Sequence, residues 1–153
     1  MAPSDREIVD RREIDDLLVR YTHAIDSSRW DMLDDVFTPD AHIDYTAAGG
    51  TKGSYPEIKQ WLAKSLGMFS YTMHLIGNTS VHFDTDGNGA RSRTYCINPM
   101  GFTNKDGSNA SFTCYVHYVD KLVRTDAGWR IAERVEQDFF LDGSLPGELE
   151  IPQ

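Results

Sequence analysis

Residues 4–26 read SDREIVDRREIDDLLVRYTHAID, and this stretch predicts a long amphipathic helix that ends near Asp26. Ser4 and Glu7 have the spacing of a capping box, in which each side chain satisfies a backbone N–H at the start of a helix. The apolar residues that follow recur at the spacing of one helical face: Ile8, Ile14, Leu17, Leu18, Tyr21 and Ile25. The chain therefore opens with a helix whose apolar face needs a second layer to pack against.

The next forty residues predict two more helices with a strand between them. A short helix over residues 27–37 stops at Thr38-Pro39-Asp40, because a proline disfavours helix at the residue before it. Residues 41–45 alternate apolar and polar side chains, which is typical of a strand. The third helix covers residues 54–66, with a serine as its cap and a proline in its first turn.

The second half of the chain predicts strands separated by glycine-containing turns. The candidate strands are residues 71–76, 80–83, 91–100, 111–124 and 129–140. Helices grouped before an antiparallel meander favour the α+β class, with three N-terminal helices on one face of a curved antiparallel or mixed sheet that encloses a cone-shaped pocket. We expect a single domain over residues 1–153, with a core of about residues 6–140 and an irregular tail over 141–153.

Composition excludes several classes of partner. The net charge of −9 argues against nucleic acid and against an anionic membrane surface, since both need a clustered basic face.

No apolar stretch approaches the ~18–20 residues of a membrane span, and the first residues lack the apolar segment of a signal peptide, so we expect a cytoplasmic protein. In that compartment Cys96 and Cys114 are expected to be buried, reduced thiols.

Two titratable residues are candidates for acid–base chemistry. Asp26 ends the first helix, where it could point into the pocket or could cap the helix that follows. His74 lies in an apolar strand, where it could act as a base or could be a hydrogen-bonded core or surface histidine. Tyr21 and Tyr45, flanked by apolar residues, are typical of core tyrosines with hydrogen-bonded hydroxyls.

Metal and nucleotide sites are poorly supported. His42 and Asp44 with a distant histidine match an iron-binding pattern, but Tyr45 lies on the opposite face of that strand, so only one of the two sets can face a pocket. Residues 84–89 resemble the start of a calcium loop, but position twelve is Tyr95 and a strand follows, so we interpret them as a turn. No glycine-rich phosphate loop, serine-hydrolase elbow or Cys-x-x-Cys motif occurs. We therefore expect neither a metal nor a cofactor.

Four blocks in this order, residues 21–31, 42–45, 74–78 and 128–131, resemble the SnoaL-like branch of the nuclear-transport-factor-2-like superfamily. The resemblance spans roughly residues 6–140 and is strongest to three lyases: scytalone dehydratase, bile-acid 7α-dehydratase and hexachlorocyclohexane dehydrochlorinase. It implies a cone-shaped α+β barrel. It also implies a homodimer or homotrimer that assembles through the exposed side of the sheet.

The same resemblance implies site residues. Asp26 and His74 match the Asp-supported histidine that abstracts a proton in those lyases, and Tyr21 and Tyr45 match pocket tyrosines. Asn98 stands where the two dehydratases carry a second histidine or an aspartate, and an amide cannot be a general acid at neutral pH. The acid for the leaving group is therefore open: His117 could replace it, or could face outward.

The predicted function is a cofactor-independent dehydratase-type lyase acting on a small apolar cyclic hydroxy-carbonyl compound, such as a steroid, terpenoid or polyketide. An isomerase or cyclase with the same pair, a non-catalytic pocket protein and the small subunit of an oxygenase remain alternatives. Asn98 and His117 are expected to bind substrate. The apolar and aromatic side chains expected to line the pocket are Trp30, Phe37, Trp61, Phe69, Met73, Met100 and Phe112.

Overall fold

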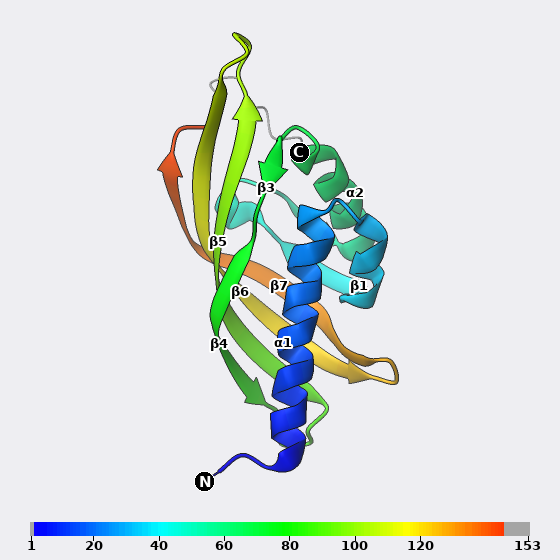
Figure 1. Cartoon of the computed structure of the whole chain (residues 1–153). Coiled ribbons are helices and arrows are strands. Elements are labelled where there is room, and N and C mark those ends of the chain that lie inside the picture. Colours follow the sequence, from blue (N-terminus) through cyan, green and yellow to red (C-terminus); the bar gives the residue numbers. More distant parts are fainter. Residues whose placement is uncertain (1, 146–153) are drawn as a thin grey trace.

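The computed structural model describes residues 2–145 and begins with the predicted long helix, α1 (Asp5–Asp26). The capping box at its start is formed, since the Ser4 side chain accepts from the Glu7 N–H and Glu7 accepts from the Ser4 N–H. The inner face of α1, which packs along the sheet (Figure 1), is buried from Asp10 onward. Ile8, predicted on that face, is 53% exposed because the step of about 100° per residue places it more than about 100° around the helix from Ile14 and Tyr21. Among the described residues, no helix is long and apolar enough to cross a membrane.

The second helical segment is shorter than predicted. It is a 3-10 helix, η1 (Trp30–Asp35), and strand β1 (Phe37–Asp44) follows it after one residue. Thr38-Pro39-Asp40, predicted to be a break, is therefore part of β1. Pro39 is tolerated there because the pairing of β1 with β7 is interrupted between Phe37 and His42, so its missing N–H breaks no ladder bond.

The remaining elements complete one seven-stranded sheet. They are η2 (Thr46–Ala48), β2 (Lys52–Ser54), α2 (Tyr55–Leu66), β3 (Tyr71–Thr72), β4 (Leu75–Phe83), β5 (Gly89–Thr103), β6 (Asn109–Thr125) and β7 (Gly128–Gly143). Neighbouring strands follow the order β2-β1-β7-β6-β5-β3, and β4 also pairs with β5. The β1–β7 pair is parallel and the others are antiparallel, so the sheet is mixed.

Two strand boundaries differ from the sequence prediction. The single strand expected over residues 71–76 is split, because Met73 and His74 leave the ladder between β3 and β4. The tail expected to be irregular from residue 141 is strand as far as Gly143, because Phe112 to Cys114 on β6 pair with residues 141–143. Residues 146–153 of that predicted tail lie outside the described residues.

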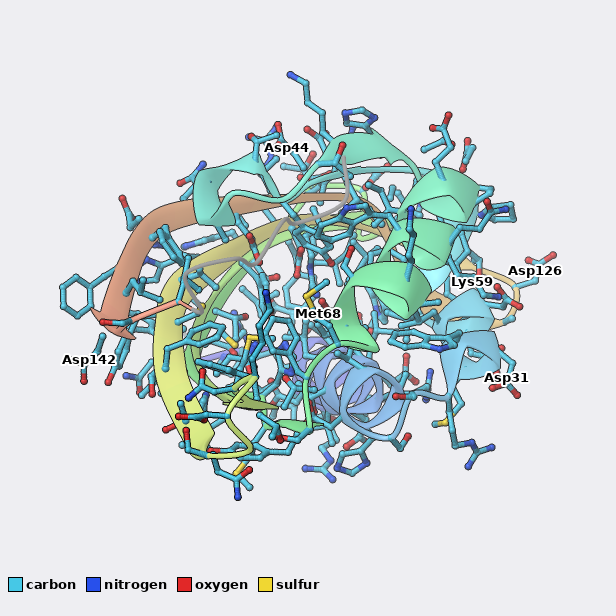
Figure 2. All side chains as sticks on the ribbon, turned by 90° about the horizontal axis from the view of Figure 1, so that it is seen from above. Asp31, Asp44, Lys59, Met68, Asp126 and Asp142 are labelled. Atoms are coloured by element: carbon cyan, nitrogen blue, oxygen red, sulfur yellow. The ribbon has the colours of Figure 1, made fainter. Side chains whose placement is uncertain are left out.

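The sheet curls strongly, and the helices pack against its inner side (Figures 1 and 2). Two irregularities in β7 contribute to the curl: Ala132 is an extra residue opposite β6, and a second shift surrounds Asp138, whose φ of 55° is in the left-handed region. Each bulge reverses which side chains point inward. This reversal decides the chemistry of the pocket.

A buried ion pair lies beneath the helical layer. Arg134 on β7 donates to both carboxylate oxygens of Asp120 on β6 at 2.8 Å, and both side chains are fully buried. The guanidinium also stacks on the rings of Tyr21 and Tyr118, at 4.1 and 4.2 Å from their centroids. Arg134 therefore links α1, β6 and β7 in one contact.

Because this pair is desolvated, removing one partner should be costly. Arg134→Met is expected to lower the free energy of unfolding by about 3–5 kcal/mol, since it leaves the Asp120 charge buried and unpaired. The double variant Arg134→Met/Asp120→Leu should recover much of that loss. Urea denaturation measures both.

Arg12→Met is the control for this prediction, because Arg12 pairs with Asp16 on the exposed side of α1 and should change stability by less than about 1 kcal/mol. A loss in Arg134→Met no larger than the loss in Arg12→Met would contradict a structural role for the buried pair.

Candidate functional site

An apolar cavity of about 330 Å³ lies between the helices and the inner face of the sheet. Figure 2 looks down on the curled sheet from above, and Met68, labelled near the centre of that view, is one of the cavity walls. The other apolar side chains that line it include Ile25, Trp61, Leu62, Leu66, Phe69, Met100, Phe112, Val116, Phe139 and Leu141. The polar side chains on its wall include Tyr21, Tyr45, His74, Asn98, Tyr118 and Glu136.

Asp26 and His74 are in direct contact at one side of this cavity. The Nδ1 atom of His74 lies 2.7 Å from Oδ1 of Asp26, and the backbone N–H of His74 donates to Oδ2 at 2.9 Å. The His74 side chain is 6% exposed and that of Asp26 is 26% exposed. Asp26 does not cap the next helix, since the residue at the start of η1 is Arg29 and no side chain caps it.

The other ring nitrogen of His74 faces a second polar group. Its Nε2 lies 3.2 Å from Nδ2 of Asn98 on β5, and the Oδ1 atom of Asn98 accepts from the Thr72 hydroxyl at 2.8 Å. With Nδ1–H donated to the carboxylate, Nε2 is the acceptor and the Asn98 amide is the donor. Three side chains, those of Asp26, Asn98 and Thr72, thus set the orientation and tautomer of the imidazole.

Tyr21 and Tyr45 are paired through their hydroxyls, which lie 2.9 Å apart and are buried. The Tyr21 ring also meets the His74 ring edge-on, with 6.2 Å between centroids. Burial raises the pKa of Tyr21 above its ordinary value and raises the pKa of Tyr45 well above it. Both hydroxyls therefore stay protonated near neutral pH and remain hydrogen-bond donors.

Sequence reasoning missed Glu136 on β7. It lines the cavity, its Oε2 atom is buried, and no described residue hydrogen-bonds that atom. Burial raises the pKa of Glu136 to about 8, against a smaller lowering by Arg134. The alternation that begins with buried Trp129 and Ile131 would have placed Glu133 inward instead, and only the bulge at Ala132 turns Arg134 and Glu136 to the inside.

Four of the predicted pocket residues lie elsewhere, so that part of the prediction is wrong. Met73 is 60% exposed, because it leaves the sheet between β3 and β4 and points away from the cavity. Trp30 packs beside α2 around a separate surface depression. His117 occupies the outer face of β6 against Tyr95, so it cannot supply a proton inside the cavity. Phe37 is buried in the core and is also absent from the cavity wall.

The structure does not support the metal alternative. Tyr45 faces the cavity, whereas His42 is exposed and Asp44 is bound to the N–H and hydroxyl of Thr46. Within residues 2–145 no group of three or more histidine, cysteine, aspartate or glutamate side chains could hold a metal ion. Cys96 is buried, Cys114 is half-buried, and burial raises their thiol pKa values to about 12 and about 11.

Comparison with known proteins identifies the family. Residues 6–135 match the SnoaL-like domain. The chain belongs to the SnoaL-like family. This SnoaL-like protein is 53% identical over 134 residues to an uncharacterized protein of Mycobacterium tuberculosis, and the match covers 88% of each chain. An uncharacterized protein of Mycobacterium bovis matches it equally well.

Solved structures share the fold. A candidate aromatic ring hydroxylase of Novosphingobium aromaticivorans is 28% identical, with a TM-score of 0.76 over 92% of this chain and 96% of that chain. A candidate scytalone dehydratase of the same organism is 19% identical, with a TM-score of 0.76 over 95% and 98%. A hexachlorocyclohexane dehydrochlorinase of Novosphingobium barchaimii is 18% identical, with a TM-score of 0.74 over 98% and 100%. The SnoaL-like protein thus has the nuclear-transport-factor-2-like fold, as its sequence predicts.

The raised pKa of Glu136 should make stability depend on pH. Between the ordinary value of 4.5 and about 8, the unfolded chain loses the Glu136 proton and the folded chain keeps it. This contribution therefore lowers the free energy of unfolding as pH rises through that window, by at most about 1.4 kcal/mol per pH unit. Glu136→Gln cannot titrate, so its stability relative to the wild type should increase from pH 5 to pH 8 in urea denaturation.

The matched control for this pH dependence is Glu133→Gln, an exposed glutamate on the same strand, whose pH profile should follow that of the wild type. Parallel profiles for Glu136→Gln and the wild type would show that Glu136 ionises normally in the folded protein.

Proposed function

We propose that this SnoaL-like protein is a cofactor-independent lyase that removes water from a small apolar cyclic hydroxy-carbonyl compound. One observation carries the proposal: the Asp26–His74 contact lies on the wall of an apolar cavity. A dehydratase and a dehydrochlorinase among the proteins of the same fold support the lyase class. The substrate class follows from the cavity, whose wall combines many apolar side chains with a few polar ones.

His74 would be the general base. A neutral imidazole is a competent base near neutral pH, and the Asp26 carboxylate would stabilise the imidazolium that forms when Nε2 takes the proton. Such general-base action contributes roughly 10²–10⁴-fold to a rate. The substrate would displace the Asn98 amide from Nε2, and the freed amide could then donate to a substrate oxygen.

The elimination would proceed through an enolate. His74 removes the proton next to the carbonyl, and the C–H electron pair moves onto the carbonyl oxygen. Tyr21 and Tyr45 would stabilise this oxyanion, because their hydroxyls are protonated and buried, and only one of the two is needed as donor in their mutual hydrogen bond. Collapse of the enolate forms the C=C bond and breaks the bond to the β hydroxyl, which leaves as water with the proton from His74.

An isomerase or cyclase is the second candidate, and one observation favours it. Asn98 stands at the position where an acid for the leaving group is expected, and an amide cannot supply a proton at neutral pH. An isomerase needs no such acid, since His74 can return the same proton to another carbon of the enolate. Loss of water would separate the two candidates in a product analysis by mass spectrometry.

The proposal predicts the effect of two variants on turnover. His74→Ala should lower the rate by about 10²–10⁴-fold without unfolding the protein, and Asp26→Asn should lose much of the rate, because an amide permits the wrong imidazole tautomer. Hydroxy-ketosteroids and hydroxy-polyketides would be screened by the absorbance of the new conjugated double bond.

His82→Ala is the control for the activity test, since His82 is an exposed histidine on β4. Once a substrate is found, full activity in either His74→Ala or Asp26→Asn would end the catalytic proposal.

We also propose that the protein self-associates, as a homodimer or homotrimer, through the outer face of the sheet. Four large apolar side chains are exposed there, on β4, β5 and β7: Leu75, Tyr95, Ile97 and Phe140, with exposed fractions of 40–65%. They surround a shallow depression that also contains His117 and Asp138. An exposed apolar patch rimmed by polar residues is typical of a protein interface.

Sedimentation velocity tests the assembly. The wild type is expected to sediment as a dimer or trimer at micromolar concentration, and Leu75→Asp/Phe140→Asp is expected to shift it toward the monomer, since both substitutions place charge in the patch. Ile8→Asp is the control, because Ile8 is exposed on α1, which packs on the inner side of the sheet, whereas the patch lies on the outer face. A wild-type protein that sediments only as a monomer would contradict the assembly.

A further inference from the structure

Glu136 is a polar group of the cavity that the proposed elimination does not use. It lies on the inner face of β7, next to its β6 neighbour Tyr118. The Tyr118 ring packs against the Tyr21 ring, with 5.6 Å between centroids. The Tyr21 ring also packs against the His74 ring. Glu136 therefore lines the same cavity as His74, but it lies on β7, whereas His74 lies between β3 and β4.

The Oε2 atom of Glu136 is left without a hydrogen bond from the described residues although it is buried. Unpaired buried polar atoms are uncommon, and each costs about 1–3 kcal/mol unless something else binds it. The neighbouring cation does not satisfy it: Arg134 donates to Asp120 through Nε and Nη2, and its Nη1, also buried, forms no hydrogen bond with Glu136. An unpaired carboxyl on a cavity wall is a group available to a ligand.

The groups that interact with Glu136 favour its neutral form. Arg134 attracts the ionised carboxyl, but burial outweighs this attraction, and the ionised Asp44 on β1 opposes a second negative charge. The other titratable groups around it are Tyr21, Tyr45, Tyr118, Cys96 and Cys114. Burial keeps all five of those protonated near neutral pH, so none adds a charge that would hold the carboxylate.

We propose that Glu136, as a neutral carboxylic acid, donates a hydrogen bond from its carboxyl group to an uncharged oxygen of the bound ligand. The proposal deepens the proposed function by naming the ligand more closely. It rests on that function only in taking this cavity as the substrate site. The substrate would be an apolar ring compound with two oxygen functions, one at His74 and Asn98 and a second, a carbonyl or hydroxyl, at Glu136.

The first test asks whether the carboxyl is neutral, and it needs no ligand. Carbon-13 NMR of protein labelled at the glutamate carboxyl carbons, with Glu136→Gln to assign the signal, follows its titration. The carboxyl signal is expected to titrate near pH 8, as the raised pKa indicates. A transition below pH 5 would overturn the proposal, because the group would then be an acceptor at working pH.

The second test measures binding of 2-acetylnaphthalene and naphthalene to the His74→Ala protein by fluorescence titration. The ketone offers one acceptor oxygen and the hydrocarbon none. At pH 6 the ketone is expected to bind about tenfold more tightly, the worth of one hydrogen bond to a buried partner. This advantage should fall above pH 8, where the carboxyl loses the proton that it donates. Burial raises the pKa values of the tyrosines and thiols around Glu136 above their ordinary values, so these groups do not titrate in that range.

Variants of Glu136 separate its donor role from its charge. Glu136→Gln keeps an N–H donor, so the preference for the ketone should persist and lose its pH dependence. Glu136→Leu loses this donor while Asn98 and the tyrosines of the cavity remain, so the preference for the ketone should fall about tenfold and lose its pH dependence. Glu133→Gln is the control and should behave as the parent protein.

Three binding results would also overturn the proposal: equal affinity for both probes in the parent protein, a ketone preference that is undiminished in Glu136→Leu, or an unchanged pH dependence in Glu136→Gln. All binding is measured with His74 removed. Failure of the catalytic proposal therefore leaves this test intact, and failure of this test leaves the catalytic pair untouched.

Discussion

The position of the candidate site depends on one carboxylate at the end of a helix. Asp26 uses both oxygens on the same residue, one on the His74 ring and one on its backbone N–H. These two contacts join residues that are 48 apart in the sequence and tie the C-terminal end of α1 to the point where β3 and β4 separate. The packing of α1 on the sheet and the orientation of the imidazole are therefore set together. A helix shifted by one residue would point Asp26 away from the histidine, because successive side chains lie about 100° apart around a helix.

The cavity is polar mainly through neutral donors. Tyr21, Tyr45 and Tyr118 stay protonated because of burial, and the same cause raises the pKa of Glu136. The buried cation Arg134 is engaged by Asp120 and by two aromatic rings. An environment of this kind favours uncharged oxygens on a ligand, and it strengthens each hydrogen bond because little water competes. It would also stabilise a negative charge that develops on a ligand oxygen during a reaction.

The features set by local sequence were predictable, and those set by sheet irregularities were not. Both capping boxes, at Ser4 and Ser54, form as their spacing indicates, since a cap involves only neighbouring residues. The identification of Asp26 and His74 came from the family resemblance, because no local pattern reports a contact across 48 residues. The two bulges of β7 escaped prediction for a physical reason. Side-chain alternation assumes an unbroken ladder, so each extra residue reverses every later inference along the strand.

The bulge around Asp138 decides which side chains at the end of β7 face the cavity and which face the outside of the sheet. It places two adjacent aromatic rings on opposite sides of one strand: Phe139 lines the cavity and Phe140 is 62% exposed on the outer face. In a regular strand such neighbours also alternate, but the alternation set by Glu136 would have turned Phe140 inward and Phe139 outward. The extra residue reverses this, so that Phe139 and Leu141 line the cavity. The proposed ligand site and the proposed subunit interface thus lie on the two faces of one strand, on separate sets of side chains. Substitutions could retune either property while leaving the other as it is.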